Sequence, residues 1–129
     1  MRSKCLMFLG FLLLLTAGCN DSAVAPVPLD FGGGDEGKQI AELVDRMNDQ
    51  SNSVSRLKAS FATGTAIGYQ ATRQYPKYRY ELKGTVSVND NTASATIAIE
   101  PHAGGTLVEK PWTFVKEGTA WKIKSAPMP

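Results

Sequence analysis

The sequence predicts an α+β domain in which N-terminal helices pack on a four-stranded, curved antiparallel sheet. Three observations lead to this fold class. Apolar residues between positions 35 and 64 recur at helical spacing, whereas from Lys77 onward they alternate with polar residues. Two turn signals, Asp90-Asn91 and Glu117-Gly118, divide the alternating part into hairpins. The elements occupy about 90 residues, which suits one small domain with a modest stability margin.

The chain begins with a segment that has the properties of an export signal. Arg2 and Lys4 precede an apolar run, residues 6–15, that is too short for a membrane-spanning helix. Small residues at 16–18 and then Cys19 follow this run. The ending resembles the lipobox of bacterial lipoprotein signal peptides, and the resemblance implies that Cys19 carries lipid and becomes the first residue of the mature chain. The alternatives are an ordinary secretory signal and an uncleaved membrane anchor.

Cysteine usage favours the lipoprotein interpretation. Cys5 and Cys19 are the only cysteines, and Cys5 lies inside the predicted signal peptide, residues 1–18. A disulfide between them would join a discarded peptide to the mature protein. A lipidated Cys19 leaves no free thiol in the mature domain, which suits an oxidising envelope.

The charge balance excludes a general nucleic-acid-binding role. Removal of residues 1–18 leaves 111 residues, with 12 of the 14 basic residues against 12 acidic ones. Phosphate binding needs a clear cationic excess, which this balance lacks. A weaker expectation is a basic sheet face that contacts an anionic envelope polymer, made of Arg79, Lys83, Lys122 and Lys124.

Residues 19–34 are predicted to be the lipidated cysteine and a flexible tether. Two prolines, a glycine triplet and no hydrophobic period characterise this stretch. As a flexible coil, its 15 residues after Cys19 would reach about 20 Å. The remaining residues, 35–129, form the predicted single domain.

The first helix is expected from Asp35 to about Asn48. Its apolar residues fall on one stripe, at Ile40, Leu43, Val44 and Met47. After a polar break, residues 54–61 predict a second helix that ends at Gly64. One long helix with a polar middle is the alternative. Residues 65–74 form either a third short helix or a loop with one helical turn, and Pro76 favours an extended Tyr75.

The strands are expected from Lys77 to the end of the chain. A two-residue turn at 90–91 pairs Val88 with Ala93, and the same register pairs Leu82 with Ile99. The third strand covers residues 106–116, with Pro111 at a bulge or a free edge. A turn at 117–118 then pairs Phe114 with Trp121.

The segment from Trp112 to Ile123 resembles the closing hairpin of small proteins of the nuclear transport factor 2-like (cystatin-like) superfamily. The order of elements, helices first and then a curved meander, agrees with that superfamily. The resemblance implies a cone-shaped sheet. Members of the superfamily include isomerases, dehydratases and non-catalytic binding modules. The enzymes place a carboxylate or histidine inside the cone, but no Asp, Glu or His falls on the inward strand positions here.

The sequence offers no catalytic or metal-binding set. His102 is the only histidine and lies in a Pro-Gly loop, so we expect an exposed residue and neither a base nor a metal ligand. No cofactor is expected. If the sheet does enclose a ligand pocket, the expected lining residues are Tyr69, Tyr75, Tyr80 and Trp112.

The predicted function is that of a bacterial envelope lipoprotein, attached to a membrane through Cys19 and facing the periplasm or the cell exterior. The domain is expected to be a non-catalytic binding or structural module that meets an envelope protein or a small ligand. The alternative is a small-ligand enzyme of the isomerase or hydrolase type that uses the concave sheet face.

Overall fold

A computed structural model describes residues 30–129. The predicted signal peptide, Cys19 and most of the predicted tether lie outside the described residues. The helices are α2 (Gly34–Gln50), α3 (Val54–Ala59), α4 (Tyr69–Gln74) and the 3-10 helix η1 (Tyr75–Lys77). The strands are β1 (Tyr78–Asn89), β2 (Thr92–Pro101), β3 (Val108–Glu117) and β4 (Ala120–Ser125).

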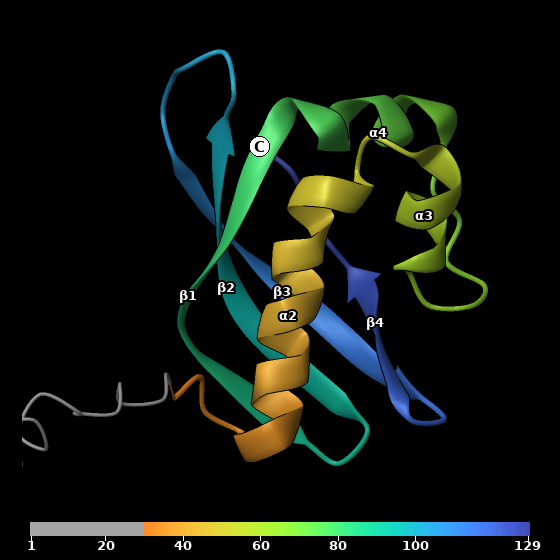
Figure 1. Cartoon of the computed structure of the whole chain (residues 1–129), viewed down its shortest axis with the longest axis vertical. Helices are drawn as coiled ribbons and strands as arrows, with labels where there is room; N and C mark the ends of the chain where they lie inside the picture. Colours follow the sequence, from red (N-terminus) through yellow and green to blue (C-terminus); the bar gives the residue numbers. More distant parts are fainter. Residues whose placement is uncertain (1–29) are drawn as a thin grey trace, which may run out of the picture.

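The predicted fold class is confirmed. The four strands form one antiparallel sheet in the order β1-β2-β3-β4, and each strand pairs with its neighbours in sequence. In Figure 1, α2 lies across one face of the sheet, and α3 and α4 lie toward the end where the chain terminates. The fold therefore has two layers around one core.

The core forms where the apolar stripe of α2 meets the inward face of the sheet. Ile40 and Met47 of α2 are fully buried, as are Ile97, Trp112 and Phe114 of the sheet. The opposite face of the sheet carries polar residues such as Ser87, Ser94 and Thr96, which are exposed. This alternation is what a sheet covered on one side only requires.

The predicted break between the first two helices is confirmed: a turn at Ser51–Ser53 separates α2 from α3, and the alternative of a single long helix is wrong. The helical part differs from the prediction in two places. Phe61 lies beyond the end of α3 and forms a parallel bridge with Ile123 of β4, so it belongs to no helical stripe. Tyr75 is helical, with φ −54° and ψ −40°, although Pro76 follows it. Its side chain is held in the core, and tertiary contacts outweigh the local preference.

The register of the first hairpin is correct near the turn and wrong beyond a bulge. Val88 pairs with Ala93 as predicted, but after the irregularity between Lys83 and Ser87 it is Leu82 that pairs with Ile97. Gly84 has a φ of +68° in this bulge. The displacement is two residues, so each side chain stays on its predicted face.

The closing hairpin is displaced in the same way. Its turn is Gly118-Thr119, and Phe114 therefore pairs with Ile123 and not with Trp121. Gly118 has a φ of +62°, which places glycine one position earlier in the turn than predicted. The shift is again two residues, so Phe114, Trp121 and Ile123 remain on the buried face.

The folded part of the chain begins before Asp35. The backbone N–H of Val86, in the β1 bulge, donates a 2.6 Å hydrogen bond to the carbonyl of Phe31. Gly32 lies so close to the strand that a Cβ on it would meet the Thr85 Cβ at 2.9 Å. Residues 31–33 of the predicted tether thus contact the sheet.

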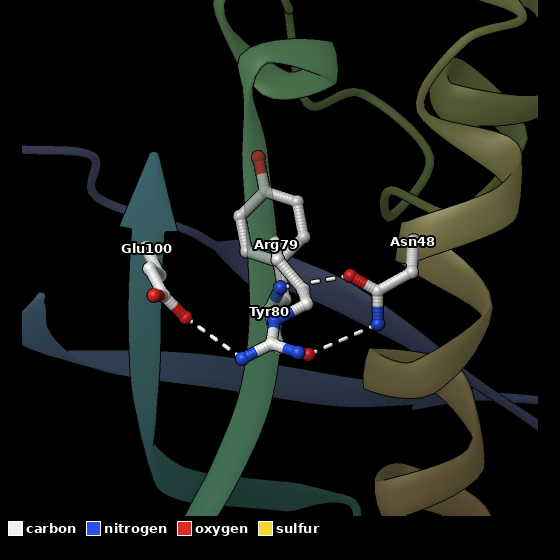
Figure 2. A network of polar contacts seen from close by, with 4 residues as sticks. All are labelled: Asn48, Arg79, Tyr80 and Glu100. Atoms are coloured by element: carbon white, nitrogen blue, oxygen red, sulfur yellow. Dashed lines mark hydrogen bonds and ion pairs between the residues drawn. The ribbon is translucent and has the colours of Figure 1, made fainter. Parts of the chain in front are cut away.

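Both outer edges of the sheet are covered in part. At β1, the Asn48 side chain accepts a 2.8 Å hydrogen bond from the Tyr80 N–H and donates a 3.0 Å bond to the Tyr80 carbonyl (Figure 2). At β4, Ile123 donates to the Ser60 carbonyl at 2.9 Å and accepts from the Ala62 N–H at 2.8 Å. These contacts occupy backbone groups that another chain would otherwise pair with.

Candidate functional site

Three of the four predicted pocket residues fill the interior and do not line an open space within it. Tyr75, Tyr80 and Trp112 are buried, with 6%, 2% and 0% of their surface exposed. Their rings lie side by side, with centroids 6.4 Å apart for Tyr75 and Tyr80 and 5.3 Å apart for Tyr80 and Trp112. Phe61 extends the row, 5.6 Å from Tyr75.

Each polar atom in this aromatic row has a backbone acceptor. Tyr80 Oη donates to the Tyr75 carbonyl at 2.6 Å, and Tyr75 Oη donates to the Ala126 carbonyl at 2.8 Å. Trp112 Nε1 donates to the Pro127 carbonyl at 3.2 Å. The C-terminal residues 126–128 therefore close one side of the row. Burial raises the pKa of the Tyr75 and Tyr80 hydroxyls, so both remain neutral at physiological pH.

Tyr69 lies away from the other three residues. It is the first residue of α4 and is 71% exposed. The Arg73 guanidinium lies 5.6 Å from the centroid of its ring, a cation–π distance. Tyr69 is therefore a surface residue, and the structure does not group it with the aromatic row.

The predicted basic sheet face is not a continuous patch. Arg79 and Lys83 lie on β1, whereas Lys122 and Lys124 lie on β4, at the opposite edge of the sheet. Arg79 also pairs with Glu100 of β2 at 2.7 Å (Figure 2). The sequence placed these cations on strands correctly but could not show that two strands separate them.

Two hollows of the described surface lie beside α2, and a third lies on the sheet beside Ser87, Ser94 and Lys124. One groove, of about 410 Å³, lies between α2, α3 and β4 and is lined by polar and apolar atoms in similar amounts; we call it the α2/α3/β4 groove. Its charged lining residues are Glu42, Arg46, Arg56 and Lys122. A second groove, of about 360 Å³, lies between α2 and β1 and is mainly apolar. Tyr80 borders this second groove together with Phe31, Ala41, Val44 and Leu82.

The sequence did not predict the α2/α3/β4 groove. Of its charged residues, only Lys122 was part of a predicted surface, the basic sheet face. Arg46, Arg56 and Trp121 lie in three different elements, and the sequence predicted Trp121 only as part of the closing hairpin. No motif spans the three elements, so the chain order contains no signal for this groove.

Within residues 30–129, no group of His, Cys, Asp and Glu has the arrangement of a metal site. His102 is exposed in the loop after β2, and its backbone N–H donates to the Lys77 carbonyl at 2.9 Å. In the same range, no helix is long and apolar enough to cross a membrane.

No family model matches the chain, and no curated protein matches it. Among solved structures, the chain is similar to one described as an "Ntf2 like protein involved in plasmid conjugation". The sequence identity is 16% and the TM-score is 0.49; the match covers 79% of this chain and 47% of that chain. The chain thus spans less than half the length of that structure. A similarity this distant carries no information about activity, ligand or partner.

Proposed function

We propose that this protein is a bacterial envelope lipoprotein whose domain is a non-catalytic binding or structural module. The observation that carries the proposal is the filled interior. The aromatic row occupies the space between α2 and the sheet, and the hydroxyls of Tyr75 and Tyr80 donate to backbone carbonyls. An enzyme acting on the concave face needs an open space there and a titratable group within reach of the substrate.

The lipobox-like sequence supports the attachment through Cys19. In this proposal, residues 1–18 are removed, and acyl groups on Cys19 hold the domain at the membrane, facing the periplasm or the cell exterior. Several acyl chains on one residue hold much more firmly than one chain. Because the chain contacts the sheet from Phe31 onward, the tether has 11 residues, 20–30. A flexible coil of that length reaches about 18 Å.

In this arrangement the domain binds molecules that lie close to the membrane surface. A short tether raises the effective concentration of the domain near other envelope molecules, so weak contacts suffice for binding. The partners we propose are an envelope protein or a small ligand. The equal numbers of acidic and basic residues in the mature chain argue against nucleic acid.

The test of attachment is mass spectrometry of the mature N-terminus, combined with membrane fractionation. We expect loss of residues 1–18 and an acyl mass on Cys19. A Cys19→Ser variant should carry no acyl mass. An intact N-terminus or an unmodified Cys19 would overturn the anchoring. Crosslinking in the native envelope then tests the binding role, which predicts a saturable adduct with a defined partner.

A further inference from the structure

The α2/α3/β4 groove collects side chains from three separate elements. α2 contributes Glu42 and Arg46, the α3 region contributes Arg56, and β4 contributes Trp121 and Lys122. In Figure 1, α3 and β4 lie on the same side of α2, which brings these elements around one hollow. The volume, about 410 Å³, falls in the range of small-ligand sites.

The groove has more cationic than anionic side chains. Three cations line it, against the single carboxylate of Glu42. Among the described residues the ion pairs are Arg79–Glu100 and Lys116–Glu36, and neither involves a guanidinium of the groove. Arg46 and Arg56 therefore keep their charge and their donors available. Arginine guanidinium groups match the planar, two-oxygen geometry of a carboxylate.

Hydrogen bonds within the groove hold its walls together. Lys122 Nζ donates to the Ala59 carbonyl at 2.7 Å, which links β4 to the end of α3. Ser60 Oγ donates to Gln50 Oε1 at 2.9 Å, which links the end of α3 to α2. These bonds use the oxygen of the Gln50 amide and leave its N–H donors for a ligand.

A second observation points to an acceptor in the groove. Trp121 lines the groove and is 4% exposed, and its indole N–H is buried with no hydrogen-bond partner among the described residues. A buried donor without a partner is destabilising. The indole of Trp112, by contrast, donates to the Pro127 carbonyl. A ligand oxygen that accepts a hydrogen bond from the Trp121 N–H would remove this penalty.

We propose that the α2/α3/β4 groove binds the carboxylate of an acidic residue in an extended peptide segment. The inference rests on the proposed binding role and names its ligand. The apolar wall of the groove favours a carboxylate carried on an aliphatic stem over free inorganic phosphate. Leu43, Ala59 and Trp121 supply apolar surface for the aliphatic part of a Glu or Asp side chain.

The test uses the full chain purified from whichever cell fraction contains it, labelled with ¹⁵N. The chain has two tryptophans and hence two indole N–H resonances. The probe is the peptide acetyl-Ala-Ala-Glu-Ala-Ala-amide, and its matched control has Gln in place of Glu. We expect saturable movement of the Trp121 resonance with the Glu peptide, a fixed Trp112 resonance, and binding of the Gln peptide that is weaker by roughly tenfold.

Variants locate the site. Arg46→Gln and Arg56→Gln should each weaken the Glu peptide by roughly tenfold, because each removes a charged donor. Arg73→Gln, on α4 beside Tyr69, should leave the affinity unchanged. Their folding is checked by the unchanged position of the Trp112 resonance.

Three results would overturn the proposal: equal affinity for the Glu and Gln peptides, tighter binding of inorganic phosphate than of the Glu peptide, or equal losses in all three arginine variants. The outcome is independent of the anchoring. A chain that lacks acyl groups but binds the Glu peptide would refute the attachment through Cys19 and support the groove.

Discussion

The side-chain amide of Asn48 takes the place of a neighbouring strand at the outer edge of β1. One amide donates to the Tyr80 carbonyl and accepts from the Tyr80 N–H, which is the pattern of a hydrogen-bonded residue pair in a sheet (Figure 2). Asn48 lies on α2, 32 positions before Tyr80. The pair therefore joins the helix to the sheet as well as covering the edge.

Replacement of Asn48 by alanine should lower the free energy of unfolding by about 1–3 kcal/mol, because it leaves the Tyr80 N–H and carbonyl without partners. Urea unfolding followed by tryptophan fluorescence measures the change. Asn52→Ala, in the exposed turn after α2, is the matched control and should change stability by less than about 0.5 kcal/mol. Equal stabilities of the two variants would show that the amide pair contributes nothing.

Because of Tyr75 and Tyr80, the free energy of unfolding is expected to decrease at alkaline pH. Burial raises the pKa of both hydroxyls, and for Tyr80 the neighbouring Tyr75 and Tyr78 add to the increase. Above about pH 10 the unfolded chain loses these protons while the folded chain keeps them. The contribution is therefore fully present below about pH 10 and decreases above it. The slope approaches about 1.4 kcal/mol per pH unit for a tyrosine that is protonated in the folded chain and ionised in the unfolded chain.

Urea unfolding between about pH 8 and pH 11 measures this slope. Tyr80→Phe should flatten it by the share of one tyrosine, whereas Tyr69→Phe, at an exposed position, should leave it unchanged. A wild-type slope in the Tyr80→Phe variant would contradict the assignment. Each variant removes one tyrosine hydroxyl, buried in Tyr80→Phe and exposed in Tyr69→Phe, so the comparison isolates the effect of burial.

The candidate site illustrates how far residue-level interpretation of the sequence extends. The alternation of Tyr78, Tyr80 and Leu82 predicted correctly that Tyr80 faces inward. It could not predict that the rings would fill the interior, because that depends on the C-terminal carbonyls of Ala126 and Pro127. Nor could it group Arg46 with Arg56 and Trp121, since only the packing of three elements brings them to one groove.

At the scale of elements, the bulge of β1 and the start of α2 form one unit. The bulge frees the Val86 N–H, and the Phe31 carbonyl accepts it. The sequence showed a glycine triplet and predicted a tether, because glycines without hydrophobic neighbours are common in linkers. In the structure Gly32, Gly33 and Gly37 instead allow a close approach between the chain before α2, the helix and β1.

Gly37→Ala tests this close approach. A Cβ at Gly37 would lie 1.6 Å from the Gly32 carbonyl oxygen, so the segment before α2 must move. Helix propensity alone would favour alanine by about 1 kcal/mol, but we expect a net loss of about 1–3 kcal/mol from the clash. Gly68→Ala is the control, because a Cβ there meets nothing within 4 Å and the φ of −68° suits any residue.

Urea unfolding of the two glycine variants gives the comparison. Gly68→Ala should be neutral or slightly stabilising, since alanine restricts the unfolded chain. Amide hydrogen exchange at Val86 should accelerate in Gly37→Ala, because its acceptor at Phe31 is displaced. A stabilised Gly37→Ala variant with unchanged exchange at Val86 would show that the glycine contact is not needed.

The two hairpin registers show what an element-level prediction can and cannot reach. Hydrophobic alternation determined which face each residue occupies, and both errors were displacements of two residues that preserve the faces. The displacements arise from the position of the second turn and from the bulge at Gly84. Neither the position of a turn nor a bulge of this kind changes the alternation of apolar and polar residues, so a period of two does not reveal them.

At the scale of the whole molecule, contacts from other parts of the chain interrupt both outer edges of the sheet. Asn48 and Phe31 occupy backbone groups of β1, and residues 60–62 occupy those of β4. The exposed face of the sheet is polar. The large exposed apolar residues lie in separate parts of the chain: Val54 in α3, Tyr69 in α4 and Leu107 in the loop before β3. Such a surface resists both edge-to-edge and face-to-face association.

We therefore expect the protein to be a monomer in detergent solution, with a protein mass equal to one chain at every concentration, as measured by light scattering coupled to size-exclusion chromatography. The double variant Asn48→Ala/Gly37→Ala opens both contacts along β1 and should associate as its concentration rises, because free strand edges pair with one another. The double variant Asn52→Ala/Gly68→Ala leaves both edges covered and should remain monomeric. A wild-type dimer, or a monomeric edge variant that is still folded, would show that edge covering does not determine the assembly state.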